Sequence, residues 1–186
     1  MIMMEQPSIS INSHDVPGPN YKMWRTILAP ENTDATGVVR MIERHNVEAL
    51  SAKKSPLRNI IINCHGLEGG GRLSVGGDGH VGIYKDNVGM FAALRPLNVG
   101  TIWLVACQAA AGPDGMSLCR AMAQNAGTIV IAGDEDQDLG VWGTYRYYAG
   151  LSGQIDDYEG TVYAFWPNGS ISRDIDPEEI VFTVKV

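Results

Sequence analysis

Two short apolar runs stand out along the chain, at residues 60–62 and residues 102–106. A third run follows at residues 129–132. None of the three alternates with polar residues, and all are rich in Ile and Val or other large apolar side chains. Such runs are typical of strands buried on both faces, as in a parallel sheet that is covered by other elements. The pattern therefore predicts three buried strands.

Segments with apolar residues at helical spacing lie before and between these runs. A helix is predicted over residues 36–51, capped within residues 32–34, and a second after Asp86 or Asn87, limited by Pro96. A third is expected from Asp114 to a stop at Gly127. The apolar positions that define the three faces are Val38, Val39, Ile42, Ala49, Leu50, Val88, Phe91, Leu94, Leu118 and Met122. Alternation of strands and helices with short connections predicts an α/β fold, a three-layer α/β/α arrangement with a mostly parallel central sheet.

Further strands are expected outside this core. Residues 22–29 read as a strand, residues 72–75 and 80–84 as a small hairpin, and residues 160–172 as a C-terminal β-hairpin. The turn of that last hairpin contains Asn168-Gly169, which supplies the positive φ angles of a tight turn. Residues 181–186 are expected to add an edge strand. No repeat or linker is visible, so residues 1–186 are expected to form a single domain.

Composition narrows the range of functions. The formal net charge is −7 and there is no cluster of Lys and Arg, so nucleic acid is not an expected partner. No apolar run reaches the ~20 residues of a membrane helix, and no secretory signal is visible, so we expect no membrane partner and a cytoplasmic protein. Three cysteines without metal-ligand spacing favour free thiols in a reducing compartment.

Two reactive side chains follow the first two apolar runs, His65 and Cys107. The carboxyl ends of parallel strands meet at one edge of a sheet, where ligands bind. A thiol nucleophile needs a nearby general base, and a histidine is the usual one. Gly66 would let a substrate carbonyl approach the backbone and leave an amide free to donate to it, as in an oxyanion hole.

The other cysteines and histidines have simpler interpretations. Cys64 points to the opposite face from His65, and Cys119 lies within a predicted helix, so both are expected to be structural. His45 shares the apolar face of its helix and is expected to be a histidine at the core edge, satisfied by a hydrogen bond. His14 and His80 have polar, Gly- or Pro-flanked surroundings typical of the surface.

A His-Gly after one apolar strand, followed about forty residues later by Ala-Cys-Gln after the next, resembles the caspase-like (clan CD) cysteine peptidases. This group includes caspases, clostripain, gingipain, separase and the bacterial CHAT peptidases. The resemblance covers about residues 20–165, and the Gly-rich residues after His65 look like the bacterial branch. It implies a caspase-like fold with Cys107 as nucleophile, His65 as proton carrier, and the amides of Gly66 and Cys107 as oxyanion donors.

The activity implied is peptide-bond hydrolysis through a thioester, with a peptide or protein as substrate. After Cys107-Gln108 the chain has Ala-Ala-Ala-Gly where caspases have Arg-Gly, which argues against caspase-like specificity for Asp. An acidic loop at residues 134–138 follows the third apolar run and could line a pocket for a basic substrate residue, or be a solvated loop. We assign Asp134, Asp136 and Gln108 to substrate binding on this reading.

No cofactor or metal is expected. Calcium would be a third use of the acidic loop, but Leu139 and Tyr145 stand where an EF-hand has its glycine and its closing glutamate. The glycines of residues 77–82 formally match a dinucleotide fingerprint, yet they lead into Ile83-Tyr84 and not into a helix.

Two other functions remain open at this point. The same fold could be a catalytically inactive module that binds a peptide or partner in its groove. The same Cys-His pair could also serve a small-molecule hydrolase or transferase. Thiol reactivity and cleavage of a peptide library would distinguish these functions from a peptidase.

Overall fold

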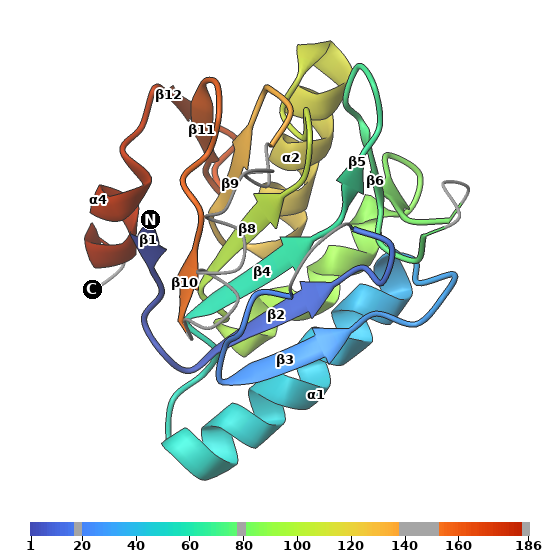
Figure 1. The fold of residues 1–186 in the computed structure, drawn as a ribbon. Coiled ribbons are helices and arrows are strands. Elements are labelled where there is room, and N and C mark those ends of the chain that lie inside the picture. Colours follow the sequence, from blue (N-terminus) through green and yellow to red (C-terminus); the bar gives the residue numbers. More distant parts are fainter. Residues whose placement is uncertain (17–19, 78–80, 138–152, 184–186) are drawn as a thin grey trace, which may run out of the picture.

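The computed structural model describes residues 1–16, 20–77, 81–137 and 153–183. A seven-stranded sheet in the order β12-β11-β9-β8-β4-β2-β3 forms the centre of the molecule (Figure 1). Its strands are β2 (Ser8–Asn12), β3 (Arg25–Leu28), β4 (Asn59–Asn63), β8 (Thr101–Val105), β9 (Val130–Gly133), β11 (Val162–Phe165) and β12 (Ile171–Arg173). The five strands from β3 to β9 are parallel, whereas β11 runs antiparallel to both of its neighbours. The prediction of a mixed α/β fold with a mostly parallel sheet is confirmed.

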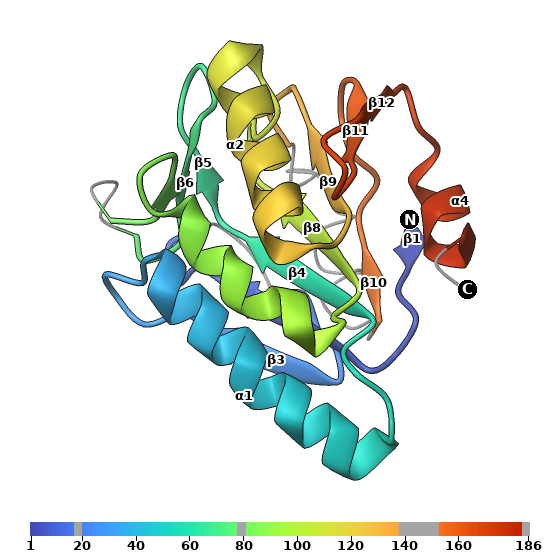
Figure 2. The ribbon, with the colours of Figure 1, turned by 180° about the vertical axis from the view of Figure 1, so that it is seen from behind.

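Three helical segments cover one face of this sheet, α1 (Ala35–Lys53), η1 (Val88–Leu97) and α2 (Gly112–Ala126), as Figure 2 shows. On the opposite face lie β1 (Ile2–Met3), β10 (Gln154–Ile155) and α4 (Pro177–Thr183) (Figure 1). A small antiparallel sheet of β5 (His65–Gly66), β6 (Arg72–Ser74) and β7 (Ile83–Tyr84) stands beside the carboxyl end of β4. Among the described helices, the three longest therefore lie on one face of the sheet, and the seven-residue α4 lies on the other.

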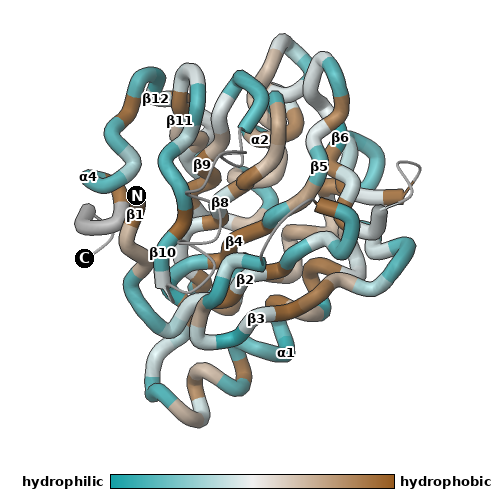
Figure 3. The backbone as a smooth tube through the Cα atoms, in the orientation of Figure 1, coloured by the Kyte–Doolittle hydropathy of each residue, from teal (hydrophilic) through white to brown (hydrophobic). Residues whose placement is uncertain are grey.

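Every residue of β2, β4, β8 and β9 is buried. Ile60 and Ile62 pack toward the helices, whereas Ile61 and Trp103 belong to a second apolar cluster on the other face. Figure 3 shows the hydrophobic strands at the centre, surrounded by more hydrophilic connections. Burial of both faces explains why the central strands lack a polar alternation.

The start of α1 and the end of α2 agree with local capping chemistry, whereas the start of α2 does not. The Asp34 side chain accepts a hydrogen bond from the Gly37 amide at the start of α1, and Gly127 ends α2 with a positive φ. Asp114 lies in the first turn of α2 but does not cap it, since the helix begins earlier. Apolar residues of η1 recur every three positions, at 88, 91 and 94, which suits a 3₁₀ helix of three residues per turn.

Two expectations about the ends of the chain have different outcomes. The hairpin of β11 and β12 is confirmed, and Gly169 in its turn has a φ of 87°. The edge strand expected at residues 181–186 is wrong for residues 181–183, which belong to α4. The Asp176 carboxylate accepts a hydrogen bond from the Glu178 amide, and Pro177 fits the first helical turn, so helix initiation prevails there.

Strand β2 is not among the strands that the apolar pattern predicts. It lies between β3 and β4 and pairs in parallel with both. Its serines and asparagine are buried because their side chains find hydrogen-bond partners, for example Ser10 Oγ on the Tyr21 carbonyl at 2.6 Å. The strand therefore joins the candidate site's edge of the sheet to the N-terminal part of the chain.

In the described part of the chain, no helix is long and apolar enough to cross a membrane.

Candidate functional site

The pairing register of β4 and β8 brings His65 and Cys107 to the same level. Asn63 and Val105 are Cα partners in this parallel pair, and the two candidate residues each follow two positions later. Contact between the two chain segments is very close, because a Cβ built on Gly66 would lie 1.6 Å from the Cys107 carbonyl oxygen. The structure thus places the predicted histidine and cysteine segments side by side at the carboxyl edge (Figure 1).

Only glycine fits at position 66. In the β5–β6 pair, the Leu67 amide donates to the Arg72 carbonyl, and Gly66 is the partner of Leu73. Bonded and non-bonded positions alternate in an antiparallel pair, so Gly66 is at a non-bonded position and its amide points away from β6. This amide is therefore available to a ligand at the edge next to Cys107.

The ring of His65 is held by a residue that the sequence analysis missed. Its Nε2 lies 3.3 Å from the Asp15 carbonyl oxygen and 3.5 Å from Asp15 Oδ2. The Ser13 hydroxyl donates to the other carboxylate oxygen of Asp15. Asp15 reaches the site because it follows the unpredicted strand β2. The alternating pattern Ser-Ile-Ser-Ile-Asn of residues 8–12 is the signal that could have indicated this strand.

This contact determines how His65 can act. The imidazole side chain is 40% exposed, and Nε2 faces Asp15, which leaves Nδ1 for a second partner. A neutral imidazole that donates from Nε2 carries its lone pair on Nδ1. The arrangement of a carboxylate against one ring nitrogen is the one that orients a general base in many hydrolases.

The three cysteines differ sharply in environment. Cys107 is partly exposed, and its Sγ lies 3.9 Å from the Gln137 carbonyl oxygen. Cys64 and Cys119 are buried, and burial raises the pKa of Cys119 to about 12. Burial raises the pKa of Cys64 far above its usual range, and the nearby charges of Asp15 and Cys107 raise it further. Only Cys107 has the surroundings of a reactive thiol.

Gln108 connects the two loops that flank Cys107. Its Oε1 accepts from the Gly69 amide at 3.1 Å, and its Nε2 donates to Asp136 Oδ1 at 3.0 Å. Its own amide donates to the Glu135 carbonyl at 2.8 Å, and its φ is 51°. A non-glycine residue with positive φ is held there by its surroundings. Gln108 and Asp136 thus lie next to Cys107, one of the two candidate catalytic residues.

Asp134 is placed differently. One carboxylate oxygen accepts from the Thr161 amide at 2.8 Å, and the other from the Tyr163 hydroxyl at 3.1 Å. The pKa of Tyr163 is raised by desolvation and by its contact with this carboxylate. Asp134 therefore joins β9 to β11, and among the three residues assigned to substrate binding it is the one whose side chain is engaged in the sheet. Asp138 of the same loop, Leu139 and Tyr145 lie outside the described residues.

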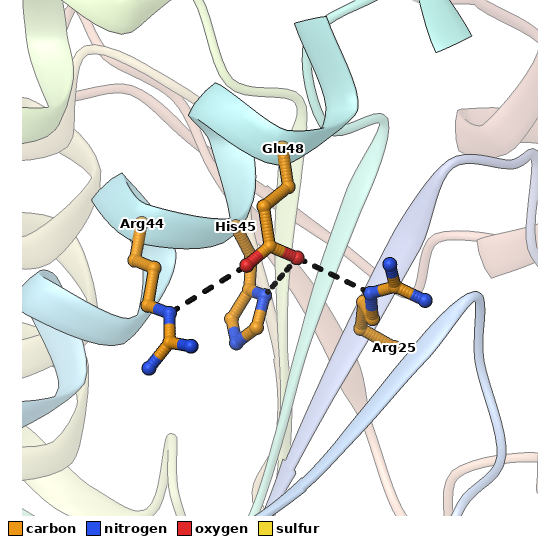
Figure 4. A network of polar contacts seen from close by, with 4 residues as sticks. All are labelled: Arg25, Arg44, His45 and Glu48. Atoms are coloured by element: carbon orange, nitrogen blue, oxygen red, sulfur yellow. Dashed lines mark hydrogen bonds and ion pairs between the residues drawn. The ribbon is translucent and has the colours of Figure 1, made fainter. Parts of the chain in front are cut away.

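The remaining histidines lie elsewhere. His45 Nδ1 is 3.1 Å from Glu48 Oε2, as expected for a satisfied histidine at the core edge, and Arg25 and Arg44 contact the same carboxylate (Figure 4). His14 is exposed, and His80 lies outside the described residues. Among the residues that the structure describes, no group of three or more His, Cys, Asp or Glu is placed to hold a metal ion.

Comparisons with known proteins give no further identification. No family model, no curated protein and no solved structure matches the chain.

Proposed function

We propose that the chain is a cysteine peptidase of the caspase-like type that hydrolyses peptide bonds with Cys107 and His65. The observation that carries the proposal is the juxtaposition of the two strand ends, with Gly66 against the Cys107 carbonyl and Asp15 against the His65 ring. The strand order around β2, β4 and β8, together with the resemblance of the two motifs, supports a caspase-like fold.

In the proposed reaction His65 Nδ1 takes the proton of the Cys107 thiol. The thiolate attacks the substrate carbonyl carbon, and a C–S bond forms as the carbonyl oxygen becomes an oxyanion. The Gly66 and Cys107 amides donate to that oxyanion. The imidazolium then protonates the leaving amine, the C–N bond breaks, and a thioester remains. Water, deprotonated by His65, hydrolyses the thioester and restores the thiol.

Asp15 has a positioning role in this proposal. Its carboxylate favours the imidazolium that forms when His65 accepts a proton, and it fixes the tautomer of the neutral ring. Asp15→Asn is expected to lower kcat/KM mainly through kcat, because the His65 ring loses the carboxylate that orients it. Asp174→Asn, an exposed surface change, serves as the control. An unchanged kcat with Asp15→Asn would remove Asp15 from the mechanism.

A peptide-library assay tests the activity itself. Purified protein and Cys107→Ala are incubated with the same library, and products are identified by mass spectrometry. Cleavage by the unchanged protein alone is expected, with a loss of about 10²–10⁴-fold in rate for His65→Ala. If no peptide is cleaved in a Cys107-dependent manner, the peptidase proposal fails.

One contact favours the alternative of an inactive binding module. The Cys107 Sγ lies 3.9 Å from the Gln137 carbonyl oxygen, so a backbone acceptor competes with His65 for the thiol proton. In such a module the groove would hold a peptide without cleaving it. Tight binding of library peptides to both the unchanged protein and Cys107→Ala, without products, would support this alternative.

A further inference from the structure

A pocket of about 460 Å³ lies beside the candidate site, between the small β5-β6-β7 sheet and the start of α2. Its volume is in the range of pockets that hold small ligands or side chains. Its lining residues are Gly70, Gly71, Arg72, Tyr84, Lys85, Asp114 and Ser117. None of these belongs to the dyad or to the residues that contact it, so the pocket needs its own explanation.

The pocket is in contact with the site through the turn at residues 69–71. Gly69 donates its amide to the Gln108 side chain, and Gly70 and Gly71 are the next two residues and line the pocket. A Cβ at Gly70 would lie 2.3 Å from the Ala111 carbonyl oxygen, and one at Gly71 would lie 2.8 Å from Asp114 Cβ. The absence of side chains at this turn therefore lets it press against the segment that leads from Cys107 into α2.

The charge of the pocket is opposite to that of the chain. The whole protein has a formal net charge of −7, yet the pocket is lined by two cations, Arg72 and Lys85, and one acid, Asp114. The Arg72 guanidinium lies over the Tyr84 ring, 5.4 Å from its centroid. This stacking orients the guanidinium. Lys85 is exposed and makes no ion pair with any residue that the structure describes.

We propose that this pocket binds a carboxylate side chain, Asp or Glu, of the peptide substrate. An arginine stacked on an aromatic ring and an exposed lysine are suited to a carboxylate, and Ser117 adds a hydroxyl donor. This proposal rests on the proposed function for the identity of its ligand.

The acidic loop near Cys107 offers the substrate a second charged contact, opposite in sign to the pocket. Asp136 lies on one side of Gln108, and the cationic pocket lies beyond Gly69 on the other. A substrate with an acidic residue in the pocket and a basic residue toward Asp136 would match both. The substrate class is then a peptide that carries both an acidic and a basic residue near the cleaved bond.

The test uses a positional peptide library in which each position carries either Glu or Gln. The unchanged protein is expected to prefer Glu at one position by about tenfold in kcat/KM, the size of one charge-assisted hydrogen bond. Lys85→Glu should abolish or reverse that preference. Lys53→Glu, which makes the same charge change at the end of α1, should keep it. High salt should weaken the preference.

Two results would overturn the proposal. One is Cys107-dependent cleavage without any Glu preference, and the other is a preference that persists in Lys85→Glu. If no peptide is cleaved, the proposed function fails, and binding decides the pocket separately. Fluorescein-labelled hexapeptides with two Glu or two Gln are then titrated into Cys107→Ala with and without Lys85→Glu. Tighter binding of the Glu peptide that depends on Lys85 supports the pocket, and equal binding refutes it.

Discussion

Gly66 shows how one residue without a side chain can determine whether the candidate site exists. Its Cα faces the Cys107 carbonyl, so the two strand ends approach more closely than any other residue type would permit. That approach brings the free amide of Gly66 to the sulfur-bearing residue. Backbone donors aimed at a developing oxyanion are often the largest contribution to such catalysis. The glycine thus serves both the packing of the site and its proposed chemistry.

Gly66→Ala is therefore expected to abolish peptide cleavage and to destabilise the fold. The added methyl group would have to displace Cys107 backbone atoms, which cannot move as a flexible side chain does. Gly89→Ala is the matched control, because a Cβ there meets no atom within 4 Å. The measurements are kcat/KM and the urea midpoint. Activity close to normal in Gly66→Ala would show that the close approach is not required.

Thiol reactivity is a second prediction at the scale of single residues. At neutral pH an alkylating reagent is expected to modify one thiol per folded chain, at Cys107. Burial, together with the raised pKa values of Cys64 and Cys119, keeps these two thiols protonated and inaccessible. Mass spectrometry should find a single adduct in the folded protein and three after denaturation in urea.

The controls for this labelling are two variants. Cys107→Ala should remove the adduct, and His65→Ala should slow its formation without redirecting it. Rapid modification of Cys64 in the folded protein would contradict the burial of this side chain.

At the scale of elements, the sequence predicted most of the helices and strands that it marks with apolar periodicity. The runs at β4, β8 and β9, the three-residue spacing of η1 and the Asn-Gly turn before β12 each carry a local signal. Strand β2 carries the local signal of alternating polar and apolar residues, but its buried Ser8, Ser10 and Asn12 are polar, so it was missed as a central strand. Their burial is stabilised by hydrogen bonds to other segments, and the sequence does not reveal those partners.

The same limit applies to the candidate site. His65, Gly66 and Cys107 could be predicted because each follows a recognisable strand. Asp15 could not, since its strand was missed, and neither could the engagement of Asp134 with Tyr163, which depends on the antiparallel pairing of β9 and β11. The pocket beside the site likewise depends on the packing of the small sheet against α2.

A buried hydrogen-bond group links three neighbouring strands and provides a stability prediction. Asn59 of β4 accepts from Trp103 Nε1 of β8 at 2.9 Å and donates to Ser8 Oγ of β2 at 3.1 Å. Asn59→Leu would leave the indole N–H buried without an acceptor, at a cost of about 1–3 kcal/mol in the free energy of unfolding. Urea denaturation measures this cost.

A double-mutant cycle separates that hydrogen bond from other effects of the change. Trp103→Phe removes the donor while it retains an aromatic ring in the core. Combined with Asn59→Leu, it should destabilise the protein by less than the sum of the two single changes. Simple additivity would mean that the Asn59–Trp103 bond contributes little to stability.

At the scale of the whole molecule, the central sheet holds two apolar cores, one on each face. Elements remote in sequence therefore depend on one another. Residues from the N-terminal strands, the central strands and the C-terminal hairpin share the second core, in which Ile2, Ile61 and Ala164 all take part. Ion pairs between elements that are lost at low pH are therefore expected to affect the stability of the whole molecule. One such ion pair, between Arg25 and Glu48, joins the edge strand β3 to α1 (Figure 4).

Glu48 supplies the carboxylate that Arg25, Arg44 and His45 share, and this arrangement gives a prediction about pH. Hydrogen bonds from His45 and Arg25 hold the pKa of Glu48 below its ordinary value of 4.5. A carboxyl whose pKa is lower in the folded state stabilises that state above the unfolded pKa and loses the effect as pH falls through the folded pKa. Glu48→Gln should therefore lower the melting temperature slightly at pH 7 and leave it unchanged near pH 2. Glu43→Gln, on the same helix and without an ion pair in the described part of the chain, is the control. A difference that persists at pH 2 would show that Glu48 acts through packing, since at that pH its carboxyl carries no charge.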